Sequence, residues 1–180
     1  MIPGNAALAL AVWVAIVLGA LTAAVLFQVL LLSEISNRQQ QRRREFDAVW
    51  RPQLALACVA DHPVSATDAP AASERLWFLL LWNRHQRQLR GVARTRLNRM
   101  LQEFGLDRYA LQQLQGADVR ARLVALGTLR HLGDRAHWAA IEPLLHDASA
   151  FLSFAAAEAL VAIDPARAMA VLLPLAERRR

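Results

Sequence analysis

The apolar run near the N-terminus restricts the fold of this chain more than any other feature. Residues 6–32 are 27 consecutive positions without a charged side chain, and 15 of them are Leu, Ile, Val or Phe. A hydrocarbon core about 30 Å thick needs roughly 20 apolar residues in a helix. At roughly −0.3 to −0.6 kcal/mol for each large apolar side chain, insertion of the run is favourable by about 6 kcal/mol. The run therefore predicts a transmembrane helix within residues 1–32.

The charges on either side of the run predict its orientation. No Lys or Arg precedes it, whereas four arginines follow within the next 12 residues. Basic residues are retained on the cytoplasmic side of a membrane helix. A secretory signal peptide would begin with a basic region and hold only roughly 7–15 apolar residues. We therefore expect a single-pass membrane protein with its N-terminus outside and residues 33–180 in the cytoplasm. All 21 basic residues are Arg, as is typical of GC-rich bacterial genomes, so the expected membrane is the bacterial inner membrane.

The rest of the composition points away from catalysis. Cys58 is the only cysteine, which excludes an internal disulfide and suits a reducing compartment. None of the five histidines lies in an H-E-x-x-H motif, and no Gly-rich phosphate loop or G-x-S-x-G elbow occurs. The sequence therefore predicts neither an enzyme activity nor a metal or cofactor site.

Helical periodicity dominates the part that follows the run. Apolar residues recur at helical spacing and no Asn-Gly or Asp-Gly hairpin turn occurs, so the chain is predicted to be all-α. Residues 33–72 are expected to form a juxtamembrane stalk, a short helix and a loop, with Pro52 as the first strong helix breaker. Residues 73–92 hold a capping helix that is apolar on every side over Leu76–Trp82. That segment is predicted either to be buried within the chain or to face a partner or the bilayer interface.

Three copies of one pattern fill residues 93–180. The pattern over residues 121–135 recurs 28 residues earlier and 31 residues later. Each copy has an amphipathic helix with apolar residues at i, i+4, i+7 or i+8 and i+11, then a turn, an N-cap Asp and a second helix. The copies predict helical hairpins at about 93–117, 118–147 and 148–180. The predicted N-cap residues are Asp107, Asp134 and Asp164.

Two short segments, Asp118-x-x-Ala121-Arg122 and Leu132-Gly133-Asp134, carry a family resemblance. They resemble the bacterial HEAT-like repeat of about 30 residues, whose consensus is Val-Arg-x-x-Ala-Ala-x-Ala-Leu-Gly-x-Leu-Gly-Asp. The resemblance covers residues 93 to about 178 and implies a short α-solenoid. It also implies a ladder of Asp and Arg side chains between neighbouring repeats, which should fail at Ser153 in the last copy. The expected ladder residues are Arg94, Asp118 and Arg122.

The resemblance also implies a class of function. Similar chains with one membrane span and HEAT-like repeats accompany bacterial envelope polysaccharide synthases and glycosyltransferases. We therefore expect a non-catalytic accessory or scaffold subunit that binds a membrane protein or a membrane-associated enzyme. Two alternatives stay open: a pigment lyase-like enzyme, because HEAT-like repeats occur in phycobilin lyases, and a membrane scaffold that associates only with itself.

Two residue patterns predict contacts of the tether and of the basic residues. Small residues at four-residue spacing favour close helix packing in lipid, against another membrane protein or a second copy. Two groups of arginines are expected to contact anionic lipid headgroups or an acidic partner. One group follows the apolar run, and the other lies between Glu74 and Glu103, where no acidic residue occurs. A solvated basic face is the alternative, and nucleic acid is not expected because aromatic residues do not alternate with these arginines. The small residues are Ala7, Ala11, Ala15, Gly19 and Ala23; the arginines are Arg42, Arg43, Arg44, Arg84, Arg87, Arg90 and Arg94.

The second helices of the repeats provide a further candidate surface. In HEAT-like arrays these helices line the concave side, which implies a partner groove. Its residues would be Arg108, Trp138, Glu142 and Arg167. Trp and Arg are enriched at binding hot spots, which favours this interpretation. The alternative is that Trp138 belongs to the hydrophobic core.

Overall fold

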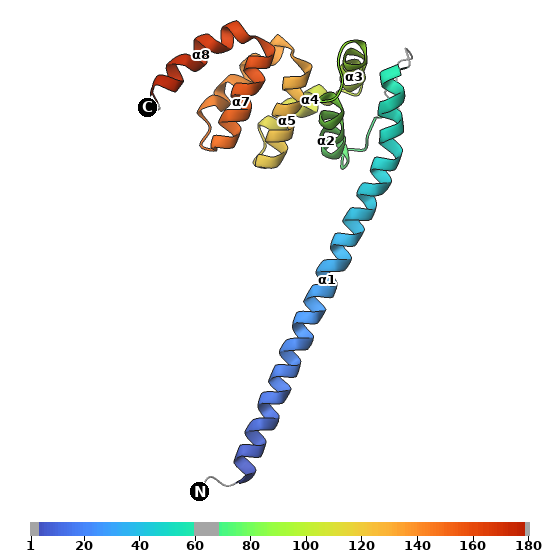
Figure 1. Ribbon diagram of the computed structural model, residues 1–180, viewed down its shortest axis with the longest axis vertical. Coiled ribbons are helices and arrows are strands. Elements are labelled where there is room, and N and C mark those ends of the chain that lie inside the picture. The colour runs from blue at the N-terminus through green and yellow to red at the C-terminus, as the bar shows by residue number, and fades with distance from the viewer. Residues whose placement is uncertain (1–3, 60–68, 179–180) are drawn as a thin grey trace. The chain divides into compact units, whose positions relative to one another are not determined.

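The described part of the chain consists of helices and short connections, without a strand. The computed structural model describes the backbone of residues 4–59 and 69–178, and side chains in 12–28, 40–59 and 69–175 (Figure 1). The all-α prediction is confirmed. The chain divides into two units, Met1–Val49 and Trp50–Arg180. The helices are α1 (Gly4–Val59), α2 (Arg75–Gln86), α3 (Val92–Glu103), α4 (Leu106–Leu114), α5 (Val119–Leu132), η2 (Arg135–His137), α6 (Trp138–Ile141), η3 (Glu142–His146), α7 (Ala150–Ile163) and α8 (Pro165–Arg178).

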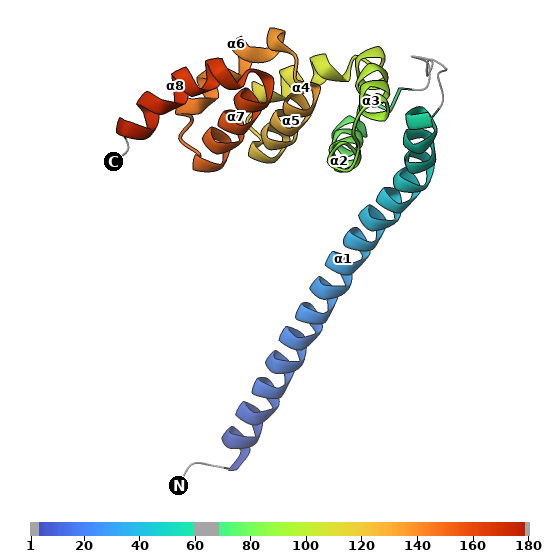
Figure 2. The same ribbon diagram turned by 45° about the horizontal axis from the view of Figure 1, so that its top comes forward.

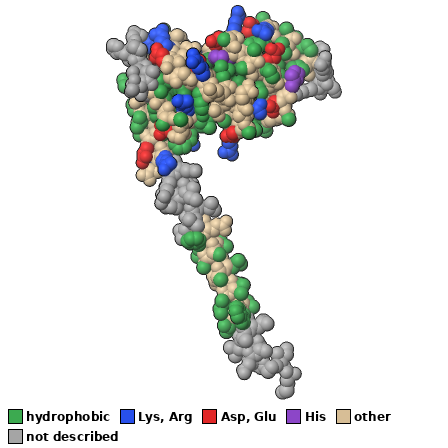
Figure 3. Space-filling view, turned by 180° about the vertical axis from the view of Figure 1, so that it is seen from behind, with side chains coloured by type: hydrophobic (Ala, Val, Ile, Leu, Met, Phe, Trp, Pro, Cys, Tyr) green, Lys and Arg blue, Asp and Glu red, His purple; other side chains and the backbone are tan. Residues whose placement is uncertain are grey.

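The first unit is formed by helix α1. Every side chain in residues 12–28 is exposed, and large apolar ones such as Trp13, Leu18 and Phe27 are more than 60% accessible. Figure 3 shows this stretch as hydrophobic side chains without charged ones. Within the side chains that the structure describes, no helical stretch is both long enough and apolar enough to cross a membrane. The predicted span, 6–32, extends on both sides into residues whose side chains are not described.

Helix α1 does not end at Pro52, where the sequence predicted a break. It continues to Val59. A proline inside a helix removes one backbone hydrogen bond at a cost of about 3 kcal/mol, and two features of the second unit offset that cost. Arg96 Nη1 donates to the carbonyl oxygens of Cys58 and Val59, at 3.1 and 2.9 Å, where the last turn has no helical donor. The same end of the helix also buries an apolar stripe: Trp50, Leu54 and Ala57.

The apolar segment of α2 is mostly buried within the chain, although Leu80 is 40% accessible. The Phe78 ring lies edge-on to the rings of Trp50 and Phe104, with centroids 4.9 and 5.9 Å away. The indole of Trp82 is fully buried and donates from Nε1 to the Leu97 carbonyl oxygen at 3.0 Å. A helix that is apolar on all sides needs neighbours on all sides. Helix α2 has neighbours in the end of α1, in α3 and in α5, and its face at Leu80 stays exposed.

Successive helical hairpins follow α2, at the three predicted places. They are α3 with α4, α5 with the η2–α6–η3 segment, and α7 with α8 (Figure 2). Gly133 closes α5 with a φ of 68°, a conformation that glycine adopts without strain. Asp134 then accepts from the Ala136 N–H, as an N-cap residue does. The predicted cap Asp107 was wrong: it lies inside the first turn of α4, and Gly105 is the N-cap.

Helix α5 lies at the centre of this unit. It packs against α2, α4 and α7. The sequence analysis placed residues 73–92 as a cap on the end of the repeats, yet α2 itself lies beside α5 in the layer that continues to α7. The physical reason lies in α3, which buries only Leu97, Met100 and Leu101 and presents arginines elsewhere. The apolar stripe of α3 is therefore too narrow to cover the apolar faces of both α2 and α5, and these two helices pack against each other.

Candidate functional site

A groove of about 670 Å³ lies between α2 and α5. Its walls come from the C-terminal half of α2 and from the outer face of α5. We call it the basic groove, because three of its lining side chains are arginines. The lining residues are Leu80, Asn83, Arg84, Arg87, Leu123, Val124, Gly127, Arg130 and His131.

The basic groove carries an excess of positive charge. Arg84 and Arg87, three residues apart at the end of α2, are exposed, and neither has a carboxylate partner among the described residues. Arg130 differs, because its Nη1 lies 2.7 Å from Glu158 Oε2 on α7. That pair is more than 40% accessible on both sides, so water screens it. The charge of Arg84 and Arg87 is therefore available to an anion.

His131 is neutral at physiological pH in this environment. Burial, followed by the nearby charges of Arg94, Arg130 and Arg87, lowers its pKa from 6.5 to about 4. Arg94 approaches because its Nη2 donates to the His131 carbonyl oxygen at 2.8 Å. A neutral imidazole has one N–H donor and one nitrogen acceptor. His131 therefore lines the basic groove without adding charge, and its ring also lies edge-on to the Trp82 indole.

Asn83 places a buried, unpaired oxygen in the wall of the basic groove. Its side chain is only 8% accessible, and its Nδ2 donates to the Val124 carbonyl oxygen at 3.1 Å. Its Oδ1 has no hydrogen-bond partner among the described residues. Gly127 gives this side chain its room, since a Cβ there would lie 3.3 Å from Asn83 Nδ2. An unpaired buried acceptor costs about 1–3 kcal/mol.

The structure groups the predicted basic residues differently from the sequence analysis. A single helical face of Arg84, Arg87, Arg90 and Arg94 required a helix that continued to Arg90, but α2 ends at Gln86 and α3 begins at Val92. Arg84 and Arg87 instead join residues of α5 that the sequence analysis did not assign to a site. No local signal could reveal this, because Asn83 and its partner Val124 are 41 residues apart.

The predicted partner groove is replaced by a packed cluster. Trp138 is 2% accessible, so the core alternative for this residue is confirmed and its assignment to the groove is wrong. Its Nε1 donates to Glu142 Oε2 at 2.9 Å, and the Arg167 guanidinium lies 4.3 Å from the ring centroid. Three of the four predicted residues therefore meet, with the exposed Arg167 and the half-buried Glu142 in contact with the buried indole. Arg108 is exposed on α4.

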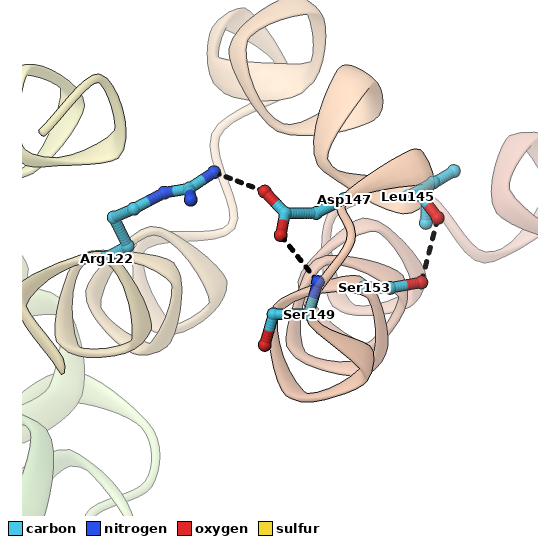
Figure 4. A network of polar contacts seen from close by, with 5 residues as sticks. All are labelled: Arg122, Leu145, Asp147, Ser149 and Ser153. Carbon is cyan, nitrogen blue, oxygen red and sulfur yellow. Dashed lines mark hydrogen bonds and ion pairs between the residues drawn. The ribbon is translucent and has the colours of Figure 1, made fainter. Parts of the chain in front are cut away.

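Arg122 of the predicted ladder pairs with a different acid, which lies in the connection between η3 and α7. Figure 4 shows Arg122 Nη2 at 2.7 Å from Asp147 Oδ2, ahead of the third hairpin. Asp147 also accepts from the Ser149 N–H. The pKa of its carboxyl group is lowered mainly by this hydrogen bond and to a smaller extent by the one from Arg122. Asp118 instead caps α5 through the Arg120 N–H. Ser153, where the ladder was expected to fail, lies on α7 of the third hairpin and donates to the carbonyl oxygen of Leu145 in η3 of the second.

The predicted contacts of the tether fall partly outside the described residues. Ala7 and Ala11 lie outside the described side chains. Ala15, Gly19 and Ala23 are exposed, and nothing lies within 4 Å of where a Cβ would stand on Gly19. The arginines at 42–44 are exposed as well. These surfaces are open in the single chain.

A second hollow, of about 620 Å³, is apolar and lies at the end of the hairpins. Phe151 and Phe154 on α7 are 79% and 68% accessible there, and Leu172 and Leu175 of α8 form the other wall. The sequence analysis did not identify this hollow. The two phenylalanines, three positions apart on one helix, were the available signal.

Other chemistry is sparse in the described part of the chain. No group of three or more His, Cys, Asp or Glu side chains there could hold a metal ion. Cys58 is half-buried, and burial raises the pKa of its thiol, which disfavours the nucleophilic thiolate. Comparisons with protein-family models, with curated proteins and with solved structures find no match to this chain.

Proposed function

We propose that this chain is a non-catalytic, membrane-anchored binding subunit. In this proposal the N-terminal part of α1 spans the bacterial inner membrane, with the N-terminus outside. The helical hairpins act in the cytoplasm as a HEAT-like module. Their partner is another membrane protein or a membrane-associated enzyme, as in envelope polysaccharide synthesis, and a second copy of the chain is the simplest alternative.

The observation that carries the proposal is the exposed apolar surface of residues 12–28. All the described side chains of that stretch are accessible, and ten of them are large and apolar. Soluble monomers rarely expose contiguous apolar patches above a few hundred Å². The hydrocarbon of a membrane can cover such a surface, because a helix forms its backbone hydrogen bonds internally and leaves no polar backbone group unpaired in the lipid. The exposed arginines at 42–44 then suit the anionic cytoplasmic surface.

The second unit supports a binding role. It has helical hairpins with glycine turns, Asp caps and one Arg–Asp bridge, in agreement with the resemblance to HEAT-like repeats. Solenoid proteins of this kind bind partners through extended surfaces. This unit offers two hollows, one basic and one apolar.

The test is membrane extraction of the full chain. We expect the wild-type protein to stay in the membrane pellet after an alkaline carbonate wash. Replacing both Val17 and Leu21 with Arg costs roughly 2.5–3.5 kcal/mol for each charge near the bilayer centre, which cancels the insertion energy of about 6 kcal/mol. That variant should move to the supernatant, while the matched control, Val92→Arg with Met169→Arg, should not. Release of the wild-type chain would contradict the proposal.

A further inference from the structure

We propose that the basic groove between α2 and α5 binds a phosphate monoester of a polyol, with the phosphoryl group on Arg84 and Arg87 and a hydroxyl group on Asn83. This ligand goes beyond the proposed function, because the groove lies entirely within the second unit and does not depend on the membrane tether. A volume of about 670 Å³ falls in the range of small-molecule sites.

The donors of the basic groove favour a phosphoryl group. Arginine guanidinium groups present forked N–H donors that match phosphate oxygens, and charge-assisted hydrogen bonds of this type are the strong ones. Arg84 and Arg87 lack a carboxylate partner among the described residues, and the neutral His131 lines the same walls. A phosphate monoester has three terminal oxygens that can accept from these forked donors, whereas a carboxylate has two.

Asn83 requires more than an anion. Its Oδ1 is an acceptor without a partner in the described part of the chain, and a phosphate dianion cannot donate to it. A ligand hydroxyl group can, once the side chains that cover this buried oxygen move aside. A site whose buried polar group is satisfied by a substrate hydroxyl strongly rejects analogues that lack the hydroxyl. The groove should therefore prefer a phosphorylated polyol to inorganic phosphate.

The remaining walls fit the body of such a ligand. Leu80, Leu123 and Val124 give the groove an apolar surface on which the C–H face of a polyol ring can lie. Glu158, paired with Arg130 at the rim, adds one negative charge near the groove. The Glu158 carboxylate repels a polyanionic chain that would extend along α5. A compact ligand with one phosphoryl group avoids this repulsion. The polyol phosphate can be a free metabolite or the headgroup of an inositol lipid that is phosphorylated on its ring.

Binding is measured by isothermal titration calorimetry on the full chain in zwitterionic nanodiscs. The probes are glucose 1-phosphate, inositol 1-phosphate, glucose, inorganic phosphate and a poly-glutamate peptide. We expect one of the two polyol phosphates to bind at least tenfold more tightly than inorganic phosphate and glucose. Nanodiscs that contain phosphatidylinositol 4-phosphate, whose headgroup carries a phosphate monoester, separate the sources: competition by that lipid indicates a headgroup ligand, and its absence indicates a free one.

Matched variants locate the site. Arg84→Gln and Arg87→Gln should each weaken binding at least tenfold, while Arg90→Gln and Arg108→Gln, which change the same charge outside the groove, should not. Gly127→Ala, which crowds Asn83, should reduce the preference for polyol phosphate over inorganic phosphate. Near-ultraviolet circular dichroism checks that each variant is folded. Equal binding of inorganic phosphate, preferential binding of the acidic peptide, wild-type affinity in Arg84→Gln, or no saturable binding of any probe would each overturn the proposal.

Discussion

Replacing Trp138 with Ala tests whether this indole belongs to the core or to a binding surface. Its 2% accessibility places nearly the whole side chain out of water. Truncation of a buried Trp costs about 3–5 kcal/mol, because the lost contacts leave a cavity that the neighbours only partly fill. The variant also loses the hydrogen bond to Glu142 Oε2 and the contact with the Arg167 guanidinium. Since domains of this size are stable by roughly 5–15 kcal/mol, the loss is a large share of the total.

The change is measured as a melting temperature, by near-ultraviolet circular dichroism on the full chain in detergent. We expect Tm to fall by about 10 °C or more. Trp138→Phe keeps a ring in place and loses one hydrogen bond, so it should cost only about 0.5–1.5 kcal/mol. Arg108→Ala, at an exposed position, should leave Tm unchanged. A Trp138→Ala protein that melts with the wild type but no longer retains a partner would refute the core assignment.

Four further outcomes are expected. Protease added to intact spheroplasts should leave residues 33–180 intact, and digestion of that region from outside would reverse the topology. Arg122→Ala should lower Tm modestly, and a double-mutant cycle with Asp147→Ala should show coupling if the 2.7 Å pair stabilises the fold. Because folding lowers the pKa of His131 from 6.5 to about 4, its contribution should be lost as pH falls through that interval, and His131→Gln should flatten the dependence of Tm on pH. Gly19→Leu should reduce recovery of a helix partner in pulldowns, while Val17→Leu, on the opposite face, should not. Equal effects of the two changes would mean that the spacing of the small residues has no role in helix packing.

The turns and caps of the hairpins could be predicted because their signals are local. Gly133 and Asp134 stand next to each other, and each acts within a few residues: the glycine ends α5 and the aspartate caps the next segment. Asp118 was recognised by its position before a helix, and it does accept from the Arg120 N–H. In each case the backbone geometry and the hydrogen bond involve residues that the sequence shows side by side.

The failures of sequence reasoning all involve partners far apart in the chain. Pro52 carries a strong local signal for a helix end, but Arg96 and a buried apolar stripe at the end of α1 override it. The sequence around Trp138 is consistent with a groove or a core, and its burial depends on packing that includes Arg167 from a later helix. The basic groove depends on which helix lies beside α5. Propensity and periodicity do not specify that choice, because it follows from how much apolar surface each helix must cover.

The central position of α5 has a consequence for how the second unit folds. Long solenoids can begin to fold at any repeat, because each repeat contacts only its two neighbours. Here one helix contacts α2, α4 and α7 at once, and each of these relies on it for part of its cover. Loss of α5 would separate the unit into fragments too small to bury their own apolar faces. The second unit should therefore unfold as a whole, and a repeat could be gained or lost in evolution only beyond α7, at the end where Phe151 and Phe154 are still uncovered.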